Sequence, residues 1–308
     1  MIVKNLSGTQ YDVVIVGGGP AGMSAALWCS ELGLSSIIID EGTSPGGQLH
    51  TIHNAIANYP GAYFANGAEC IGAFRSSLER HPFNLISNAV VETVNAESVE
   101  VLVGDHRLKG KALILATGVR RRRLNVIGED EFRDNGILVS GVAQRRSVKG
   151  KHIAVIGGGD AALENALLLS EFAEQVYLIH RGREFTAREE FVERVASEPK
   201  IKSLMSSTVR SINGDSQLRS VTVGFKGGNR DIELDHLIIR IGVDPNSELV
   251  RSQLETDTNG YVVVDATCRT SARACFAIGD VASPLSPTIA TAVGMGATAA
   301  KNIQKIVR

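Results

Sequence analysis

The feature that most constrains this chain is a glycine-rich loop that occurs twice in the same local setting. The first copy lies in YDVVIVGGGPAG, residues 11–22, where an apolar run leads into Gly17, Gly19 and Gly22. This G-x-G-x-x-G spacing is typical of a strand, a tight turn and a helix that bind the pyrophosphate of a dinucleotide. The glycines let the backbone approach the ligand, and the helix N-terminus directs free N–H groups at the phosphates.

The second copy is HIAVIGGGDAA, residues 152–162, with Gly157 and Gly159 in the first two glycine positions. Alanine stands in the third position, which the fingerprint allows. In both copies a second apolar strand ends equally far beyond the loop, at Asp40 in the first and at His180 in the second. Two such units in one register are hard to obtain by chance, so the sequence predicts two dinucleotide-binding sites.

The two strand ends differ in charge. An acidic residue at this position accepts hydrogen bonds from a free ribose, whereas basic residues suit a 2′-phosphate. Asp40 and Glu41 end the strand of the first unit, which favours FAD or NAD. The basic residues at the second strand end are His180, Arg181, Arg183 and Arg188. They favour NADPH over NADH at the second site.

Composition sets broad limits on the function. A length of 308 residues suits about two domains, and 44% apolar residues are enough for real cores. The net charge of −1 argues against a general nucleic-acid binder. No apolar run approaches the length of a membrane span, and the first ten residues lack the apolar stretch of a signal peptide. We therefore expect a cytoplasmic protein with neither nucleic acid nor membrane as a partner.

The remaining segments extend the pattern of an α/β fold. The first unit is followed by an expected helix at 67–79, alternating strands within 90–103 and a buried strand at 112–116. The second is followed by a meander of strands at 206–239, further strands at 262–264 and 275–278, and a helix of small residues from 288 onward. The chain is expected to leave its first domain near Gly118 and to return near Val243.

Motifs along nearly the whole chain resemble those of the low-molecular-weight thioredoxin reductases. They are GGGPAG (17–22), PGGQ (45–48), NYPG (58–61), ATG (116–118), GGGDAA (157–162), HR (180–181), GVDPN (242–246), IGD (278–280) and the terminal TIATA helix. The resemblance implies an α/β fold of two Rossmann-like, three-layer ββα domains. An NAD(P) domain, 119–242, would be inserted in an FAD domain made of 1–118 and 243–308. The resemblance also implies a homodimer.

The same motifs imply the binding residues. The FAD site would comprise Gly17, Gly19, Pro20, Ala21, Gly22, Asp40, Glu41, Gly47, Gln48, Leu49, Asn58, Ala116, Thr117, Gly118, Gly279, Asp280, Thr288, Ile289 and Ala290. The nicotinamide nucleotide site would comprise Gly157, Gly159, Asp160, Ala161, His180, Arg181, Arg183 and Arg188. No catalytic side chain and no metal are expected, because the flavin carries the chemistry.

The chain departs from these relatives at the redox-active cysteines. Thioredoxin reductases carry a C-x-x-C pair just ahead of the second glycine loop, but the window 135–149, NGILVSGVAQRRSVK, contains no cysteine. Dithiol exchange needs a thiolate pair, so we do not expect thioredoxin reductase activity. Of the four cysteines, Cys29 and Cys275 are expected in the core, and Cys70 and Cys268 are undecided.

Two functions remain open. The first is an FAD-dependent NAD(P)H oxidoreductase whose acceptor is not an active-site disulfide, by analogy with ferredoxin/flavodoxin–NADP reductases of this architecture. The second is a non-catalytic FAD-binding sensor or interaction protein, which the loss of the cysteines and of two arginines, at Gly182 and Thr186, would suit. The run Arg120 to Arg123, with Arg145 and Arg146, is either a landing patch for an acidic electron carrier or a solvated loop.

Overall fold

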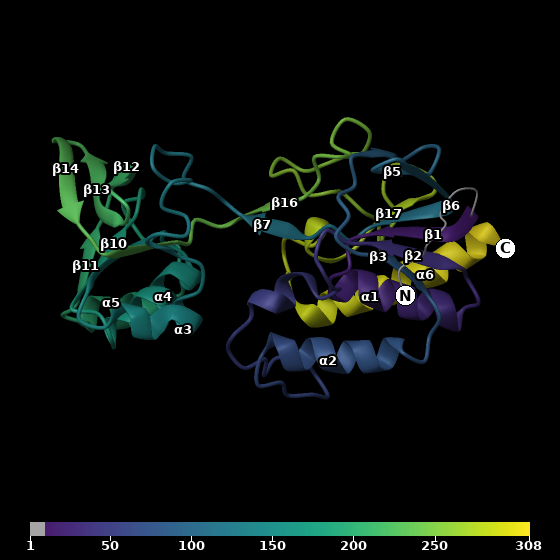
Figure 1. Ribbon diagram of the computed structural model, residues 1–308, viewed down its shortest axis with the longest axis horizontal. Coiled ribbons are helices and arrows are strands. Elements are labelled where there is room, and N and C mark those ends of the chain that lie inside the picture. Colours follow the sequence, from purple (N-terminus) through teal and green to yellow (C-terminus); the bar gives the residue numbers. More distant parts are fainter. Residues whose placement is uncertain (1–9) are drawn as a thin grey trace. The chain divides into compact units, whose positions relative to one another are not determined.

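The chain folds into two compact units. The structure is a computed structural model that describes residues 10–308. Unit 1 consists of Met1–Arg120 and Asp244–Arg308, and unit 2 is Arg121–Val243. Each unit is a parallel sheet between a layer of helices and a layer of further strands, which is the expected α/β class with two Rossmann-like domains (Figure 1).

The parallel sheet of unit 1 is built from apolar runs that are buried on both faces, as parallel strands require. Its order is β3 (Asn84–Ile86), β2 (Ser36–Ile39), β1 (Gln10–Val16), β6 (His106–Leu115) and β17 (Cys275–Ala277). The antiparallel pair β4 (Thr93–Asn95) and β5 (Glu100–Val103) joins the start of β6. The carboxyl ends of all five parallel strands therefore meet at one edge.

Helices cover one face of this sheet and strands with long loops cover the other. The helices are α1 (Pro20–Glu31), α2 (Gly67–Leu78) and α6 (Ile289–Val307), with short 3-10 turns η1 (Gly47–Thr51) and η3 (Gly279–Val281). Figure 1 shows the three helices along one side of the sheet. Alternate residues of β1 consequently serve two cores, with Val13 and Ile15 facing the helices and Val14 and Val16 facing the opposite layer.

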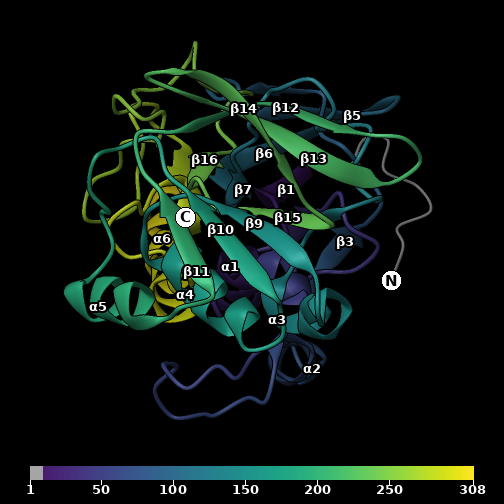
Figure 2. The same cartoon turned by 90° about the vertical axis from the view of Figure 1, so that its left-hand side faces the viewer.

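Unit 2 repeats this plan. Its sheet is parallel throughout, in the order β11 (Ile201–Leu204), β10 (Gln175–Ile179), β9 (His152–Ile156), β15 (His236–Ile239) and β8 (Ile137–Leu138). The helical elements are α3 (Gly141–Gln144), η2 (Arg145–Val148), α4 (Asp160–Ser170) and α5 (Glu189–Ser197). The opposite layer is an antiparallel sheet of β12 (Thr208–Gly214), β13 (Leu218–Phe225) and β14 (Gly228–Glu233). Figure 2 shows both sheets of this unit.

The two segments that connect the units run side by side. They form a two-stranded sheet of β7 (Val119–Arg121) and β16 (Val243–Pro245). Within residues 10–308, no helix combines the length and the apolar character that a membrane crossing needs.

Two strand predictions were wrong. Residues 236–239 do not belong to the meander, because the apolar run HLII is largely buried and pairs in parallel beside β9. Residues 262–264 do not form a strand. Val262 makes only an isolated bridge with Thr256, because the preceding turn is closed by Asp257, whose carboxylate accepts from the backbone N–H groups of Asn259 and Tyr261. Val262 is thus buried without joining a ladder, and Val263 beside it is exposed.

The packing of α6 on α1 depends on a glycine. A Cβ atom added to Gly296 would lie 2.7 Å from the carbonyl oxygen of Ala21 and 2.8 Å from the amide nitrogen of Ala25, so the two helix backbones are in near contact. Gly294, two residues earlier in α6, is exposed and has open space around the same position.

We predict opposite effects for two matched substitutions in α6. Gly296→Ala should lower the stability of unit 1 by about 1–3 kcal/mol because the helices must move apart. Gly294→Ala should raise it by about 1 kcal/mol because alanine favours an open helix position. Trp28, the single tryptophan, lies on α1, so its fluorescence during urea unfolding reports unit 1. Equal destabilisation by both substitutions would contradict this account of the contact.

Candidate functional site

The first glycine loop holds its shape by close backbone contacts. Gly17 has φ +104°, and a Cβ atom there would lie 2.3 Å from the carbonyl oxygen of Ala116 at the end of β6. A Cβ atom on Gly22 would lie 2.0 Å from the carbonyl oxygen of Gly17. Gly19 precedes α1 and has no side chain to cap it, so within residues 10–308 no side-chain cap satisfies the first-turn N–H groups at this helix end. The loop therefore offers an anion site that a phosphate can complete.

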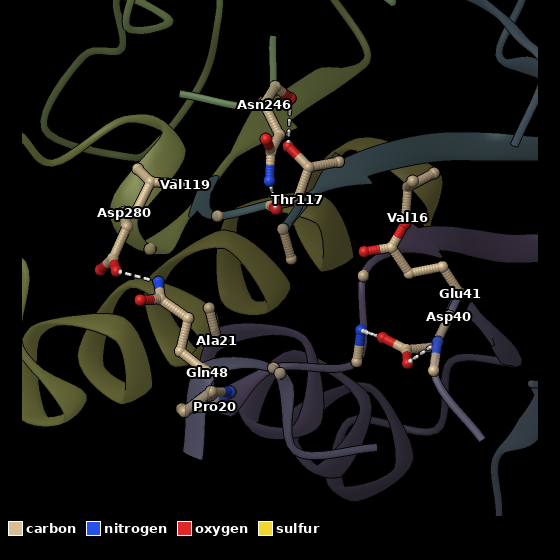
Figure 3. A pocket seen from close by; sticks show the side chains of 18 of the residues that line it. Val16, Pro20, Ala21, Asp40, Glu41, Gln48, Thr117, Val119, Asn246 and Asp280 are labelled. Carbon is tan, nitrogen blue, oxygen red and sulfur yellow. Dashed lines mark hydrogen bonds between the residues drawn. The ribbon is translucent and has the colours of Figure 1, made fainter. Parts of the chain in front are cut away.

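Asp40 closes the loop from the carboxyl end of β2. Its side chain is 8% exposed and accepts hydrogen bonds from the backbone N–H of Gly18, at 2.5 Å, and of Gly42, at 2.9 Å. Each carboxylate oxygen has further lone pairs, so these bonds leave capacity for ribose hydroxyls. Asp40 thus fixes the loop and also faces the cleft beside it (Figure 3).

His180 takes the corresponding place in unit 2. The space beside the middle loop glycine is filled by Asp40 at Gly18 and by His180 at Gly158, and the same two side chains crowd Gly42 and Gly182. The His180 ring lies 5.6 Å from that of Phe185, and its Nε2 atom contacts the carbonyl oxygen of Glu184 at 3.0 Å. The repeat therefore extends to tertiary contacts, and the two middle glycines have a packing reason that the spacing alone does not reveal.

A cleft of about 670 Å³ opens in unit 1 at the carboxyl edge of its sheet. Expected site residues along it are Gly17, Gly19, Pro20, Ala21, Asp40, Glu41, Gly47, Gln48, Leu49, Ala116, Thr117, Gly118, Gly279, Asp280, Thr288 and Ile289. Three expected residues, Gly22, Asn58 and Ala290, do not line it. Gly22 instead packs α1 on the loop, and Asn58 is exposed.

The sequence interpretation missed several lining residues. They are Val16, Gly18, Ile39, Gly42, Ser44, Thr51, Ile52, Ala89, Val90, Val91, Val119, Arg120, Asn246, Glu248, Leu249, Ile278, Pro287 and Ala292. Some had a usable signal, since Asn246 stands in the GVDPN motif. Val90 and Val91 had none, because only the return of the chain after β3 brings them to the cleft. His50 also lines the cleft, with Nε2 3.1 Å from the carbonyl oxygen of Ser44.

A half-buried carboxylate lies at the end of the cleft formed by η3. Gly279, with φ +71°, turns the chain after β17 so that Asp280 enters the cleft. The amide Nε2 of Gln48 donates to Oδ2 of Asp280 at 3.0 Å (Figure 3). Burial raises the pKa of Asp280 above its ordinary value, and the hydrogen bond from Gln48 opposes that rise. A hydroxyl donor from a ligand would offset the cost of this partly desolvated charge.

The wall of the cleft near the unit boundary is held by a reciprocal pair of hydrogen bonds. Thr117 donates through Oγ1 to the carbonyl oxygen of Asn246 at 2.6 Å, and Asn246 donates through Nδ2 to the carbonyl oxygen of Thr117 at 2.8 Å (Figure 3). Arg120 adds a bond to Oδ1 of Asn246 at 2.9 Å and an ion pair with Glu248. The departing and returning segments are thereby locked together beside the site.

These features fit a dinucleotide. The cradle of glycines leaves no room for side chains, the helix end is uncapped, and Asp40 and Asp280 each present a carboxylate along a cleft of ligand size. Residues 10–308 contain no group of three His, Cys, Asp or Glu side chains that could hold a metal ion.

The second nucleotide site differs in its basic residues. Arg188 donates to Asp160 from its backbone N–H, at 2.8 Å, and from Nε, at 2.7 Å, and its Nη1 pairs with Glu190 at 3.1 Å. Two carboxylates therefore offset the charge of Arg188, which the sequence interpretation assigned to a 2′-phosphate. Arg181 and Arg183 are exposed at the end of β10 and form no ion pair with any residue that the structure describes.

The cysteines are all free and buried. Burial raises the pKa of the Cys29 and Cys275 thiols to about 12 and that of Cys268 to about 11, and it also raises the pKa of Cys70. The core positions expected for Cys29 and Cys275 are confirmed. In the window ahead of the second glycine loop, Ser140 caps α3 by accepting from the backbone N–H of Ala143 at 3.3 Å. Its hydroxyl thus has a structural partner.

The arginine run is divided among acidic partners. Arg120 pairs with Glu248, while Arg123 contacts Glu129 at 3.6 Å and Asp130 at 2.6 Å. These pairs reduce the net charge that the run shows to solvent. An electron-carrier patch would have to rest on the other arginines.

Comparison with known proteins places these features in context. The family profile described as "Pyridine nucleotide-disulphide oxidoreductase" matches residues 11–296. The thioredoxin reductase of Listeria innocua is 32% identical and covers 96% of this chain and 94% of its own, and that of Mycolicibacterium smegmatis is 34% identical and covers 97% of each. A crystal structure of Lactococcus lactis thioredoxin reductase superposes with a TM-score of 0.84, at 32% identity, over 96% of this chain and 99% of its own.

We predict that Asp280→Asn has opposite effects on flavin retention and on the flavin-free protein. Flavin should be held about tenfold more weakly, because an amide accepts a hydroxyl proton less strongly than a carboxylate. The flavin-free variant should unfold at a higher temperature at neutral pH. The raised pKa of Asp280 means that its ionised carboxylate destabilises the folded state, and this destabilisation is fully present above the raised pKa. Below the ordinary aspartate pKa both forms are neutral, so that advantage should vanish. Unchanged flavin retention would remove Asp280 from the site.

Proposed function

This chain belongs to the pyridine nucleotide-disulphide oxidoreductase family, with the thioredoxin reductases as its relatives, and from that premise we propose that its electrons leave by a route other than a disulfide of its own. The family uses FAD and NAD(P)H. We propose that NADPH is the donor and that a one-electron carrier of the ferredoxin or flavodoxin kind is the acceptor. A quinone and dioxygen are the alternative acceptors.

The observation that carries this proposal is the placement of the cysteines. All four are buried, their thiol pKa values are raised, and none lies within residues 135–149. Only a thiolate attacks a disulfide, so thiols held in the neutral form are poor partners for exchange. A flavin in the unit 1 cleft would therefore have no protein disulfide as its partner within the chain.

The residues of unit 1 have separable tasks in this function. FAD, when bound, supplies the redox chemistry by taking two electrons from a nicotinamide nucleotide and passing them on. The loop of Gly17 and Gly19 and the N-terminus of α1 would hold its diphosphate, and Asp40 would accept from the adenosine ribose. Asp280, oriented by Gln48, would accept from a hydroxyl of the ribityl chain. The protein thus binds and orients, and no side chain has to move a proton in the first half-reaction.

The preference for NADPH rests on the two arginines at the end of β10. Arg181 and Arg183 are exposed there, and a guanidinium group suits a phosphate because it donates in a bidentate way. Arg188 forms ion pairs with Asp160 and Glu190, so fewer basic side chains are available for a 2′-phosphate than the sequence suggests. The smaller number of available basic side chains also favours the second candidate function, an FAD-binding sensor whose flavin is no longer reduced by a nicotinamide nucleotide.

We predict that NADPH reduces the bound flavin under anaerobic conditions, and that NADH does so at a higher concentration. The measurement is the loss of the yellow flavin absorbance after mixing. Reoxidation is then followed in parallel with flavodoxin, ferredoxin, a quinone and dioxygen. Failure of both nucleotides to bleach the flavin would leave the sensor function in its place.

We further predict that thiol alkylation leaves electron transfer intact. The enzyme would be reduced with excess NADPH, treated with iodoacetamide and assayed with the best acceptor. An enzyme that works through a disulfide exposes its thiols on reduction and is then inactivated, whereas the buried thiols here should escape. Mass spectrometry of the native protein should find no modified cysteine. Loss of activity in step with modification of one cysteine would overturn the proposed route.

A further inference from the structure

Unit 2 holds two arginine side chains that share one backbone acceptor and form no ion pair within residues 10–308. Nη1 of Arg121 donates to the carbonyl oxygen of Val139 at 2.6 Å, and Nη2 of Arg240 donates to the same oxygen at 3.1 Å. Both guanidinium groups therefore meet at one atom. Among the residues that the structure describes, no Asp or Glu side chain pairs with either group. Apart from a bond between Nη1 of Arg240 and the carbonyl oxygen of Ile239, their other donors remain available.

This arrangement costs energy in the empty protein. Arg240 is half-buried, and burial together with the nearby charge of Arg121 lowers the pKa of Arg240 to about 10. Two like charges beside one carbonyl repel each other, and the backbone carbonyl dipoles of Val139 and Ile239 compensate them poorly. An anion placed between the two groups would remove the repulsion and use their free donors in a bidentate way.

The pair lies at the edge of the sheet where doubly wound folds bind nucleotides. Arg240 follows β15 and Val139 follows β8, and both strands run parallel to β9. The backbone N–H of Arg240 donates to the carbonyl oxygen of Ile156 at 2.7 Å, and a Cβ atom on Gly157 would lie 2.1 Å from the carbonyl oxygen of Arg240. The arginine is therefore a direct neighbour of the first glycine of the second loop. Figure 2 shows β15 beside β9.

Strand order decides which half of a nucleotide the pair can reach. β10 lies on one side of β9, and β15 and β8 lie on the other side. The end of β10 carries His180 and the two arginines proposed to bind a 2′-phosphate, Arg181 and Arg183. In such folds the adenosine end of the nucleotide binds at the end of the strand corresponding to β10, and the diphosphate binds at the loop that follows the strand corresponding to β9. An anion at Arg121 and Arg240 therefore lies on the side away from adenosine.

We propose that Arg121 and Arg240 form a clamp for the nicotinamide-side phosphate of the nucleotide bound by unit 2. This inference rests on the proposed function, because it deepens the nucleotide site of the same enzyme. The clamp recognises a diphosphate, which NADPH and NADH share. With Arg188 neutralised, the 2′-phosphate contributes less to the binding free energy, and the clamp makes the diphosphate at the centre of the ligand contribute more. Both nucleotides should therefore depend on the two arginines to the same degree.

The test uses oxidised protein with FAD bound and redox-inert ligands, so that it is independent of flavin reduction. Isothermal titration compares ADP-ribose, which carries both phosphates, with AMP, which lacks the second. Arg121→Met and Arg240→Met should each weaken ADP-ribose about tenfold or more and leave AMP within about twofold. Arg240→Lys should recover part of the loss. Arg230→Met, on β14 in the opposite layer, is the matched control and should change neither ligand.

Thermal unfolding separates this clamp from a purely structural role. Without nucleotide, Arg121→Met should raise the unfolding temperature or leave it unchanged, because it removes repulsion, whereas loss of a structural contact would lower it. ADP-ribose should stabilise the wild type more than either variant. The inference is overturned if the wild type does not bind ADP-ribose, if both variants bind it as tightly as the wild type, or if AMP weakens equally. Clamp-dependent ADP-ribose binding without flavin bleaching by NADPH would defeat the proposed function and leave this inference standing.

Discussion

The near contact between backbones around α1 is the constraint on which the rest of unit 1 depends. Gly17 lies against Ala116, Gly22 lies against the carbonyl oxygen of Gly17, and Gly296 of α6 lies against Ala21 and Ala25. Each contact excludes a side chain, so the N-terminus of α1 lies against the carboxyl edge of the sheet, beside the cleft. The glycines that set this packing therefore also shape the wall of the cleft.

The same fold is used twice with different chemistry at equivalent positions. Asp40 and His180 fill the same space beside the middle loop glycine. Asp40 is a carboxylate held by two backbone N–H groups, whereas His180 is a ring that lies tilted against the ring of Phe185. An acid at this position suits a free ribose, and a base suits a phosphate. In the proposed function, this difference would separate a flavin-binding unit from a nicotinamide-binding unit within one architecture.

Burial decides the character of the remaining functional groups. Asp280 keeps a carboxylate in a partly desolvated cleft, where a ligand hydroxyl has most to offer, and the cysteines lie so deep that their thiols stay protonated. In unit 2 the positive charges of Arg121 and Arg240 lie close together without an ion-pair partner among the described residues, and a bound anion would reduce their repulsion. In all three cases the cost of desolvation, rather than the residue type alone, sets what the group can do.

The sequence by itself determined the two nucleotide units, the Asp40 and His180 contrast and the missing cysteine pair, because these depend on local spacing and residue type. It also indicated sixteen of the residues that line the cleft in unit 1, which is fewer than half of them. Only the tertiary structure decided the rest. Residues 236–239 join the parallel sheet rather than the meander, because a buried apolar strand needs partners on both sides. Arg188 forms an ion pair with Asp160. Val90 and Val91 line the cleft because the chain returns to it after β3. Arg121 and Arg240 lie far apart in sequence, and only the order of parallel strands brings their charges to one oxygen atom.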